Sequence, residues 1–270
     1  MTEAFSPTRR VQRVRHTLEA RLCTVQAVRD LSPGLRRITL ASEALTRFNS
    51  ASFDDHIKLM LPPADGSPLV LPTLGADGPS TPPPGAVRPT MRDFTPRAFN
   101  LATGTLDIEF ALHGHGPAAS WAANARPGQQ VGVGGPRGSL VIPVDFDWHL
   151  LVGDESALPA IARRLEELPA GSVVQVFIAT GDAADRRTLT TAAALQIQWF
   201  DATEPEALAR AVAAWTPPPG EGYAWAAGEA AEIAAVRRVL VGQHALPKEQ
   251  VRAAAYWKRG ATAHHENLEA

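Results

Sequence analysis

The chain of 270 residues is long enough for one large domain or for two of ordinary size. Hydrophobic residues make up 45% of it and charged residues 20%, a composition typical of a globular protein that buries a core and not of a disordered one. The formal net charge of −2 gives no general attraction for nucleic acid or for an anionic membrane, so an anionic ligand needs a local group of cations.

Cysteine content and hydropathy exclude further classes. Cys23 is the only cysteine, which excludes an intrachain disulfide, a cysteine-ligated iron–sulfur cluster and a thiolate zinc site. Residues 1–20 are arginine-rich and lack the apolar run of a secretory signal, and we expect them to be a flexible segment. The sequence has no apolar stretch of about 18 residues, so no transmembrane helix is predicted. A cytoplasmic protein without stable membrane insertion is therefore expected.

Residues 21–145 carry the pattern of an antiparallel β-barrel. Alternating apolar residues predict strands, and the segment that begins with Gly-Pro predicts a short helix at 116–125. In the strand over 54–62, alternation places Lys58 and Met60 on one face and Leu59 on the other. Residues 62–89 are too rich in proline for regular structure and predict a loop. The expected strands cover residues 22–32, 35–42, 54–62, 91–100, 105–114 and part of 127–143.

From residue 146 to 262 strands alternate with helices, which predicts a doubly wound α/β domain with a parallel sheet, followed by a short tail at 263–270. The segment 172–180 is almost continuously apolar, as expected of a parallel strand that is buried on both faces. The expected strands cover 148–156, 172–180, part of 191–202, 222–230 and 250–260, and the expected helices cover 157–168, 204–215 and 230–242.

Four segments, in this order, resemble the siderophore-interacting FAD-dependent ferric reductases, a branch of the ferredoxin-reductase-like flavoproteins. They are "MRDFTPRAFN", "LDIEFALHGHGPAASWAANARPGQQVGVGGPRGS", "LLVGDESALPAIARRLEEL" and "AWAAGEAAEIAAVRRVL…AAAYWKRG". The resemblance runs from about residue 23 to 260. It implies an FAD-binding barrel, an α/β domain that binds NADPH or NADH, and reduction of Fe³⁺ in a siderophore so that Fe²⁺ is released.

The resemblance assigns the flavin to two elements. In this family an Arg-x-Tyr-Thr or Arg-x-Tyr-Ser strand binds FAD, which implies that Arg92 pairs with a phosphate, Phe94 lies against the isoalloxazine ring and Thr95 binds near its N5 edge. Phe94 replaces the usual tyrosine, so stacking is kept and the phenolic hydrogen bond is lost. The second implied element comprises His113, Gly114, Ala118, Ala119 and Ser120, with the helix start facing the pyrophosphate. The residues alone also allow an ordinary edge strand followed by a glycine-rich turn.

The nicotinamide site is expected at the carboxyl edge of the parallel sheet. No GxGxxG fingerprint is present, and "GDESALPAI" stands after the first strand in its place. Ser156 can cap the following helix, and Arg186 weakly favours the 2′-phosphate of NADPH. The residues expected to bind NAD(P)H are Asp154, Glu155, Ser156, Arg186, Gly228 and Glu229.

A ferric siderophore is mostly anionic, and the resemblance places cations around it that position it: Lys58, Arg137, Lys258 and Arg259. The chemistry belongs to the flavin, so we name no acid–base residue and no metal site. The alternatives are a general flavin-dependent reductase with a quinone or protein acceptor, and a non-catalytic siderophore-binding or flavin-storing protein. A ferredoxin is an alternative electron donor, no nucleic-acid partner is expected, and a monomer is expected.

Overall fold

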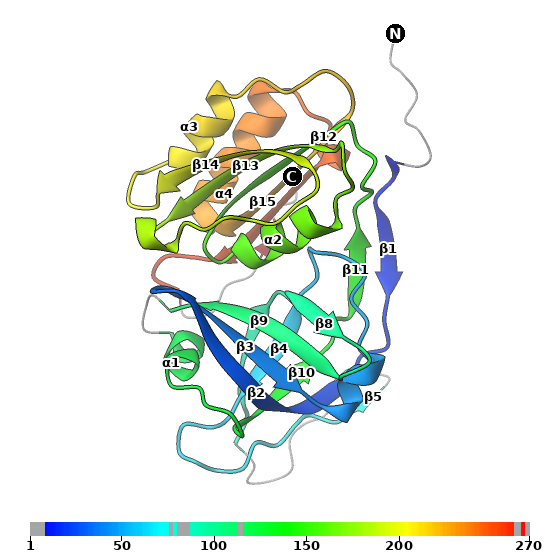
Figure 1. The fold of residues 1–270 in the computed structure, drawn as a ribbon, viewed down its shortest axis with the longest axis vertical. Helices are drawn as coiled ribbons and strands as arrows, with labels where there is room; N and C mark the ends of the chain where they lie inside the picture. Colours follow the sequence, from blue (N-terminus) through cyan, green and yellow to red (C-terminus); the bar gives the residue numbers. More distant parts are fainter. Residues whose placement is uncertain (1–8, 76–77, 80–86, 113–115, 262–265, 268–270) are drawn as a thin grey trace. The chain divides into compact units, whose positions relative to one another are not determined.

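The computed structural model of the protein describes residues 9–75, 78–79, 87–112, 116–261 and 266–267. The chain forms two compact units, and each is described here by itself (Figure 1). One unit is Gln12–Val141. The other joins Ile142–Ala270 to the N-terminal residues Met1–Val11.

The first unit is built on an antiparallel sheet with the strand order β7-β4-β10-β2-β3-β9-β8 (Figure 1). A tight turn after Ser32 joins β2 to β3, as the sequence predicts. The short helix α1 (Pro117–Ala123) begins with the predicted Gly-Pro pair. The strands are β2 (Ala20–Ser32), β3 (Leu35–Ala41), β4 (Ile57–Leu61), β7 (Thr90–Phe94), β8 (Ala98–Asn100), β9 (Thr105–Ala111) and β10 (Gln130–Gly134).

The core of this unit follows the alternation of the strands. Ile57 and Leu59 of β4 are buried, and Lys58 between them is exposed. Met60 shares the face of Lys58 but is also buried, because a side chain from the proline-rich segment reaches this face: Leu71 lies against Gly132 of β10, beside Met60. The loop therefore covers part of the outer face of the sheet. Two short strands within it, β5 (Leu74–Gly75) and β6 (Gly78–Pro79), pair with each other.

A two-stranded ribbon departs from the expectation for the N-terminus. Residues 1–20 are predicted to be irregular, yet β1 (Gln12–Arg15) pairs along its whole length with β11 (Gly138–Val141). The four side chains of β1 are exposed, so they carry no apolar alternation that predicts a strand. Pairing with a segment more than 100 residues away satisfies the backbone of β1, and local sequence does not reveal such a partner.

The second unit is a doubly wound α/β fold, as predicted, with the strand order β14-β13-β12-β15-β16-β17. Pairing is parallel from β14 to β16, and β17 (Glu266–Asn267) is antiparallel. The parallel strands are β12 (Trp148–Asp154), β13 (Val173–Thr180), β14 (Ala194–Asp201), β15 (Gly222–Glu229) and β16 (Val251–Trp257), and the helices are α2 (Leu158–Glu167), α3 (Ala207–Ala214) and α4 (Ala230–Arg238).

Helices cover both faces of this sheet (Figure 1). Leu150 and Val152 of β12 pack in one cluster with apolar residues of α3 and α4. Gly153, the next residue along β12, faces α2 on the other side of the sheet. A Cβ added at Gly153 would lie 3.6 Å from Ile161 Cδ1 of α2. The strand β13 is buried from its second residue onward, which confirms the expectation from its continuous apolar run.

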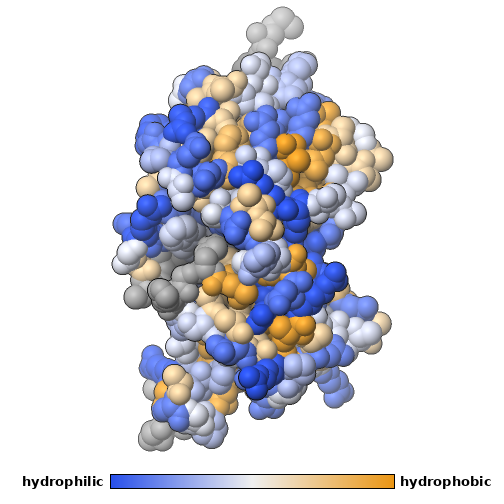
Figure 2. Space-filling view, turned by 60° about the vertical axis from the view of Figure 1, so that its left-hand side comes forward, coloured by the Kyte–Doolittle hydropathy of each residue, from blue (hydrophilic) through white to orange (hydrophobic). Residues whose placement is uncertain are grey.

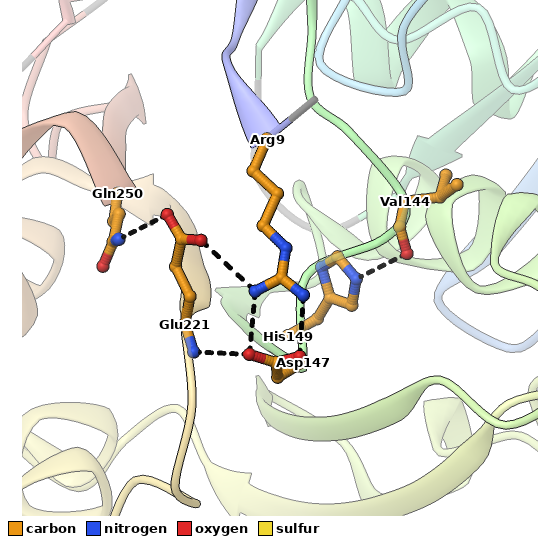
Figure 3. Close-up of polar contacts among 6 residues, drawn as sticks. All are labelled: Arg9, Val144, Asp147, His149, Glu221 and Gln250. Atoms are coloured by element: carbon orange, nitrogen blue, oxygen red, sulfur yellow. Dashed lines mark hydrogen bonds and ion pairs between the residues drawn. The ribbon is translucent and has the colours of Figure 1, made fainter. Parts of the chain in front are cut away.

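Arg9 fastens the N-terminal residues to the second unit (Figure 3). Its Nη1 and Nη2 atoms each lie 2.8 Å from an Asp147 oxygen, and Nη1 lies 3.2 Å from Glu221 Oε2. Asp147 Oδ2 also accepts from the Glu221 backbone N–H at 2.7 Å. The hydrogen bond from Arg9, followed by that from Glu221, lowers the pKa of Asp147 to about 2. Arg9 thereby bridges the chain just before β12 and the chain just before β15.

The surface drawn in Figure 2 intersperses hydrophilic and hydrophobic residues. Hydrophobic side chains that are more than one-third exposed in the described part of the chain include Met91 of β7 and Trp257 of β16. Among the described residues, no helix has the length and apolar character needed to cross a bilayer.

His149 predicts how the stability of the second unit depends on pH. Burial, helped by the positive charge of Arg164, lowers the pKa of His149 from 6.5 to about 4. The unfolded chain therefore binds the additional proton between these values, and stability falls as the pH drops through this window. Between pH 7 and pH 4.5 this group removes about 2 kcal/mol from the free energy of unfolding. Urea unfolding at the two pH values measures the loss.

The His149→Gln variant should lose that share of the pH dependence. A His244→Gln variant, which removes a half-buried histidine from the same unit, is the matched control and should keep it. Equal pH dependence of the wild type and the His149→Gln variant would contradict the assignment.

Candidate functional site: the carboxyl edge of the parallel sheet and strand β7

The strand order of the second unit marks a ligand crevice. Strand order reverses between β12 and β15, which are neighbours in the sheet while their successors run outward in opposite directions. In such sheets, ligands bind outside the carboxyl ends of the strands at this reversal. The two strands end at Asp154 and Glu229, so residues that the sequence predicts for NAD(P)H lie at the reversal point.

Asp154 holds the ends of three strands together. Its Oδ1 accepts from Ser156 N–H at 2.9 Å and from the Ser156 hydroxyl at 2.5 Å. Its Oδ2 accepts from Glu229 N–H at 2.9 Å and from Trp257 Nε1–H at 2.8 Å. Burial raises the pKa of Asp154, and the hydrogen bonds from Ser156 and Trp257 oppose that rise. The carboxylate thus connects the end of β12 to β15 and β16.

Two glycines make this arrangement sterically possible. Gly228 has φ +150°, and a Cβ there would lie 2.6 Å from Asp154 Oδ2. A Cβ at Gly153 would lie 2.5 Å from the Ala227 carbonyl oxygen and would also clash with Ala157. Both positions require glycine, because a Cβ at Gly153 would meet the backbone of β15 and the start of α2, and a Cβ at Gly228 would meet the carboxylate of Asp154.

Glu155 and Ser156 occupy different roles from those expected. Glu155 is buried, and its Oε1 accepts from the Gly181 backbone N–H at the end of β13. Ser156 was expected to cap α2, but no side chain caps that helix, whose N-cap is Ala157. The Ser156 hydroxyl donates to Asp154 instead, because the turn after β12 points it back toward the buried carboxylate.

Glu229 caps α4 and reaches the segment after β16. Its Oε2 accepts from Ala231 N–H at 2.7 Å and Glu232 N–H at 3.2 Å, and its Oε1 accepts from Arg259 N–H at 3.1 Å. Partial burial raises the pKa of Glu229, but the backbone donors of Arg259, Glu232 and Ala231 outweigh it and leave the pKa below its usual value. The backbone of Arg259 is thereby fixed next to the crevice.

The cations near this edge are exposed. Lys258 and Arg259 directly follow β16, and both are exposed to solvent. Arg186 lies in the exposed segment after β13, where its Nε approaches Thr180 Oγ1 at 3.4 Å. Lys258 and Arg259 therefore lie directly after Trp257, the last residue of β16.

Trp257 is the residue of this site that sequence reasoning missed. Its indole N–H is held by the buried Asp154, yet 38% of the residue remains exposed. An aromatic residue at the last position of a parallel strand, directly before two cations, was the available signal. An indole that is fixed at its edge and exposed on its face suits stacking against an aromatic ring.

In the first unit, β7 carries the predicted flavin strand. Arg92 and Phe94 lie directly opposite Leu59 and Ile57 of β4, on the core-facing side, and both are half-buried. The Phe94 ring lies 4.5 Å from that of Phe110, which packs in turn on Trp121 of α1 at 5.7 Å. Phe94 is therefore partly a core residue.

The second predicted flavin element is only partly described. His113 and Gly114 lie outside the described residues. Ala118 and Ala119 are half-buried in the first turn of α1, and Ser120 is exposed. Among the described residues, no side chain caps this helix and no acidic residue lies in its first turn. The amides of its first turn therefore lack a side-chain cap from the described part of the chain.

The two cations of the first unit that are assigned to the chelate are Lys58 in the sheet and Arg137 in the segment after β10. Lys58 is the strand partner of Gly134, and Arg137 follows Gly134 by three residues. Arg137 is exposed. Lys58 forms an ion pair with Asp93, its partner across β7. Among the described residues, no group of three or more histidine, cysteine, aspartate or glutamate side chains is placed to hold a metal ion.

A curled antiparallel sheet followed by a parallel sheet of this order defines the ferredoxin-reductase-like fold. The cytochrome b5 reductase domain of Ulva prolifera nitrate reductase shares it with a TM-score of 0.58 at 10% identity, covering 86% of this chain and 96% of that domain. The siderophore-interacting FAD-binding domain family matches residues 24–140, and the siderophore-interacting protein family matches residues 146–260. The chain belongs to the siderophore-interacting FAD-binding protein family. The predicted family and the predicted fold class are thus confirmed.

Similar proteins match nearly the whole chain. The NADPH-dependent ferric-chelate reductase of Escherichia coli is 38% identical over 91% of this chain and 96% of its own length. The ferric vibriobactin reductase ViuB of Vibrio cholerae is 32% identical over 87% of this chain and 89% of its own. A siderophore utilization protein from T. fusca has a TM-score of 0.85 at 33% identity, covering 96% of this chain and 99% of that one.

The Asp154→Ala variant should be strongly destabilised. The substitution leaves the buried donors of Ser156, Glu229 and Trp257 without their acceptor, which is expected to cost about 3 kcal/mol of unfolding free energy. Urea unfolding measures the loss. The control is Asp182→Ala, which removes an exposed cap of a 3₁₀ turn in the same unit and should cost about 1 kcal/mol. Equal losses would show that Asp154 does not hold the strand ends.

Proposed function

We propose that the protein is an FAD-dependent ferric-siderophore reductase that takes electrons from NADPH. The observation that carries the proposal is the near full-length 38% identity with an NADPH-dependent ferric-chelate reductase. The ligand crevice at the reversal of strand order supports it, because a dinucleotide is the usual ligand of such a crevice.

The residues present fit an FAD in the first unit. Arg92 offers a guanidinium for phosphate, the exposed part of Phe94 offers an apolar surface for the isoalloxazine, and the uncapped start of α1 offers amides. Thr95 is buried directly after β7. When bound, FAD accepts a hydride from the nicotinamide and passes electrons singly to Fe³⁺. The chain itself binds and orients the flavin, and Phe94 does so without a phenolic hydrogen bond.

On the nicotinamide side, we infer that the chain acts chiefly by organising the crevice. The oxygens of Asp154 are engaged by four donors, so this residue contributes through the strand ends that it holds. Gly228 permits the close approach, and Glu229 fixes the backbone of Arg259. Trp257 supplies an exposed aromatic face. Arg186 remains the candidate for the 2′-phosphate, because it is exposed after β13.

The substrate and setting complete the proposal. Lys58, Arg137, Lys258 and Arg259 are assigned to positioning the anionic ferric siderophore, since exposed cations attract an anionic chelate. A ferredoxin as alternative electron donor, a monomeric state and a cytoplasmic location are parts of the proposal that need their own tests. No acid–base residue is assigned, because one-electron transfer to Fe³⁺ does not itself require a proton from the chain.

The proposal is tested by anaerobic stopped-flow absorbance of the FAD-loaded protein. NADPH should bleach the flavin faster than NADH, and a ferric siderophore should then restore the oxidised spectrum. Failure of both nicotinamides to bleach the flavin would contradict the reductase function. Restoration at equal rates by a quinone and by ferric chelates would favour a general flavin reductase instead.

The Arg92→Ala variant should bind FAD about tenfold to a hundredfold more weakly, because a charge-assisted pair with phosphate is lost. Equilibrium titration of the apoprotein, followed by flavin fluorescence, measures the change. Arg88→Ala is the matched control, since Arg88 is an exposed arginine two residues before the same strand, and its affinity for FAD should stay within about twofold. Equal weakening of both variants would remove Arg92 from the flavin site.

A further inference from the structure

One of the cations assigned to the ferric chelate already forms an ion pair with a carboxylate. Lys58 of β4 and Asp93 of β7 are directly opposite each other across the two strands. The Lys58 Nζ atom lies 2.7 Å from Asp93 Oδ1 and 2.8 Å from Oδ2. The Lys58 side chain is 53% exposed and that of Asp93 is 19% exposed. The lysine of the pair is therefore open to solvent, and the aspartate is largely buried.

The strand alternation of β7 explains why Asp93 is there. Arg92 and Phe94, the residues proposed for FAD, face the core-facing side opposite Leu59 and Ile57. Asp93 between them must face outward, on the side of Lys58. The position between the two residues proposed for FAD therefore carries an acid that faces away from them.

The strand partner of Lys58 on its other side cannot neutralise the charge of the lysine. Gly134 of β10 is its strand partner on that side and has no side chain. Asp93 is therefore the acid that the sheet places beside Lys58, whereas Arg137, three residues after Gly134, has no ion pair with a described residue. Of the two cations of this unit that are assigned to the chelate, Lys58 is therefore paired with a carboxylate, and Arg137 has no ion pair with a described residue.

The charge balance determines which chelates benefit. An anion that approaches Lys58 meets an ion pair with no net charge. An anion that draws the exposed Lys58 side chain away leaves Asp93 without this cation, and Asp93 then repels the anion more strongly with each negative charge on the chelate. A neutral chelate experiences no such repulsion.

We propose that Asp93 is a specificity-determining residue that, by pairing with Lys58, disfavours strongly anionic ferric chelates relative to neutral ones. The inference rests on the proposed function, because it takes Lys58 as part of the chelate site. Asp93 is a positioning residue that acts through Lys58. The wild type then discriminates more strongly against chelates of high negative charge than a variant without this acid.

The test measures binding of redox-inert gallium chelates to the FAD-loaded protein by fluorescence titration. Gallium tris-catecholate is a trianion and gallium tris-hydroxamate is neutral, and both match the charge and shape of their ferric counterparts. The Asp93→Asn variant keeps the size of the side chain and removes its charge. It should raise the ratio of catecholate affinity to hydroxamate affinity about fivefold, and the gain should shrink with added salt.

Two further variants make the result specific. Asp30→Asn removes the same charge from an exposed pair with Arg36 in the same unit, and it should leave the ratio within about twofold. Lys58→Gln introduced into the Asp93→Asn protein should cancel the gain, as expected if the two residues act as a unit. An equal increase in the Asp30→Asn variant would overturn the proposal, because net charge alone would then explain it.

Three other outcomes overturn the proposal. They are an unchanged ratio in the Asp93→Asn variant, a gain that persists without Lys58, and a protein that binds neither gallium chelate in wild-type or variant form. Because gallium is not reduced, these outcomes do not depend on turnover. Failure of NADPH to bleach the flavin would contradict the reductase function while leaving the affinity ratio to decide the role of Asp93.

Discussion

The hydrogen bonds of Asp154 are the interaction on which the second unit depends at its functional edge. A parallel sheet with reversed strand order leaves its strand ends at the crevice, and loops there have few apolar contacts to fix them. Asp154 replaces such contacts with polar ones, since it accepts from residues at the ends of β15 and β16 as well as from Ser156. Its burial makes each donor costly to lose, so the strand ends are held as a set.

The same edge shows why a motif search is insufficient. The familiar glycine fingerprint is absent after β12, yet a steric demand for glycine is present: Gly153 stands against the backbone of β15, and Gly228 stands against the Asp154 carboxylate. Glycine is needed by the packing and not by a particular spacing in sequence. The start of α2 is then left without a side-chain cap, because Ser156 is engaged by the carboxylate before the helix.

Sequence reasoning recovered the parts of the structure that local patterns encode. Alternation predicted β4 and β9, a continuous apolar run predicted β13, and Gly-Pro predicted α1. It could not find β1, because the side chains of β1 are exposed and its backbone pairs with a strand that is distant in sequence. It also could not foresee the hydrogen bonds of Glu155 and Ser156, which it assigns to the nicotinamide cofactor, because the direction of a side chain in a turn depends on the acceptors and donors that folding brings there.

The cations show the same limit in electrostatic form. Lys58 and Arg137 look equivalent in sequence, as exposed basic residues of a mildly acidic protein. The fold distinguishes them, since β7 places a carboxylate against Lys58 and leaves Arg137 without an ion pair to a described residue. A single strand thus carries two kinds of information: its inner face presents Arg92 and Phe94, and its outer face sets the charge around Lys58. On the proposed assignments, selectivity for a substrate can change through Asp93 while Arg92 and Phe94, the residues proposed for the flavin, stay as they are.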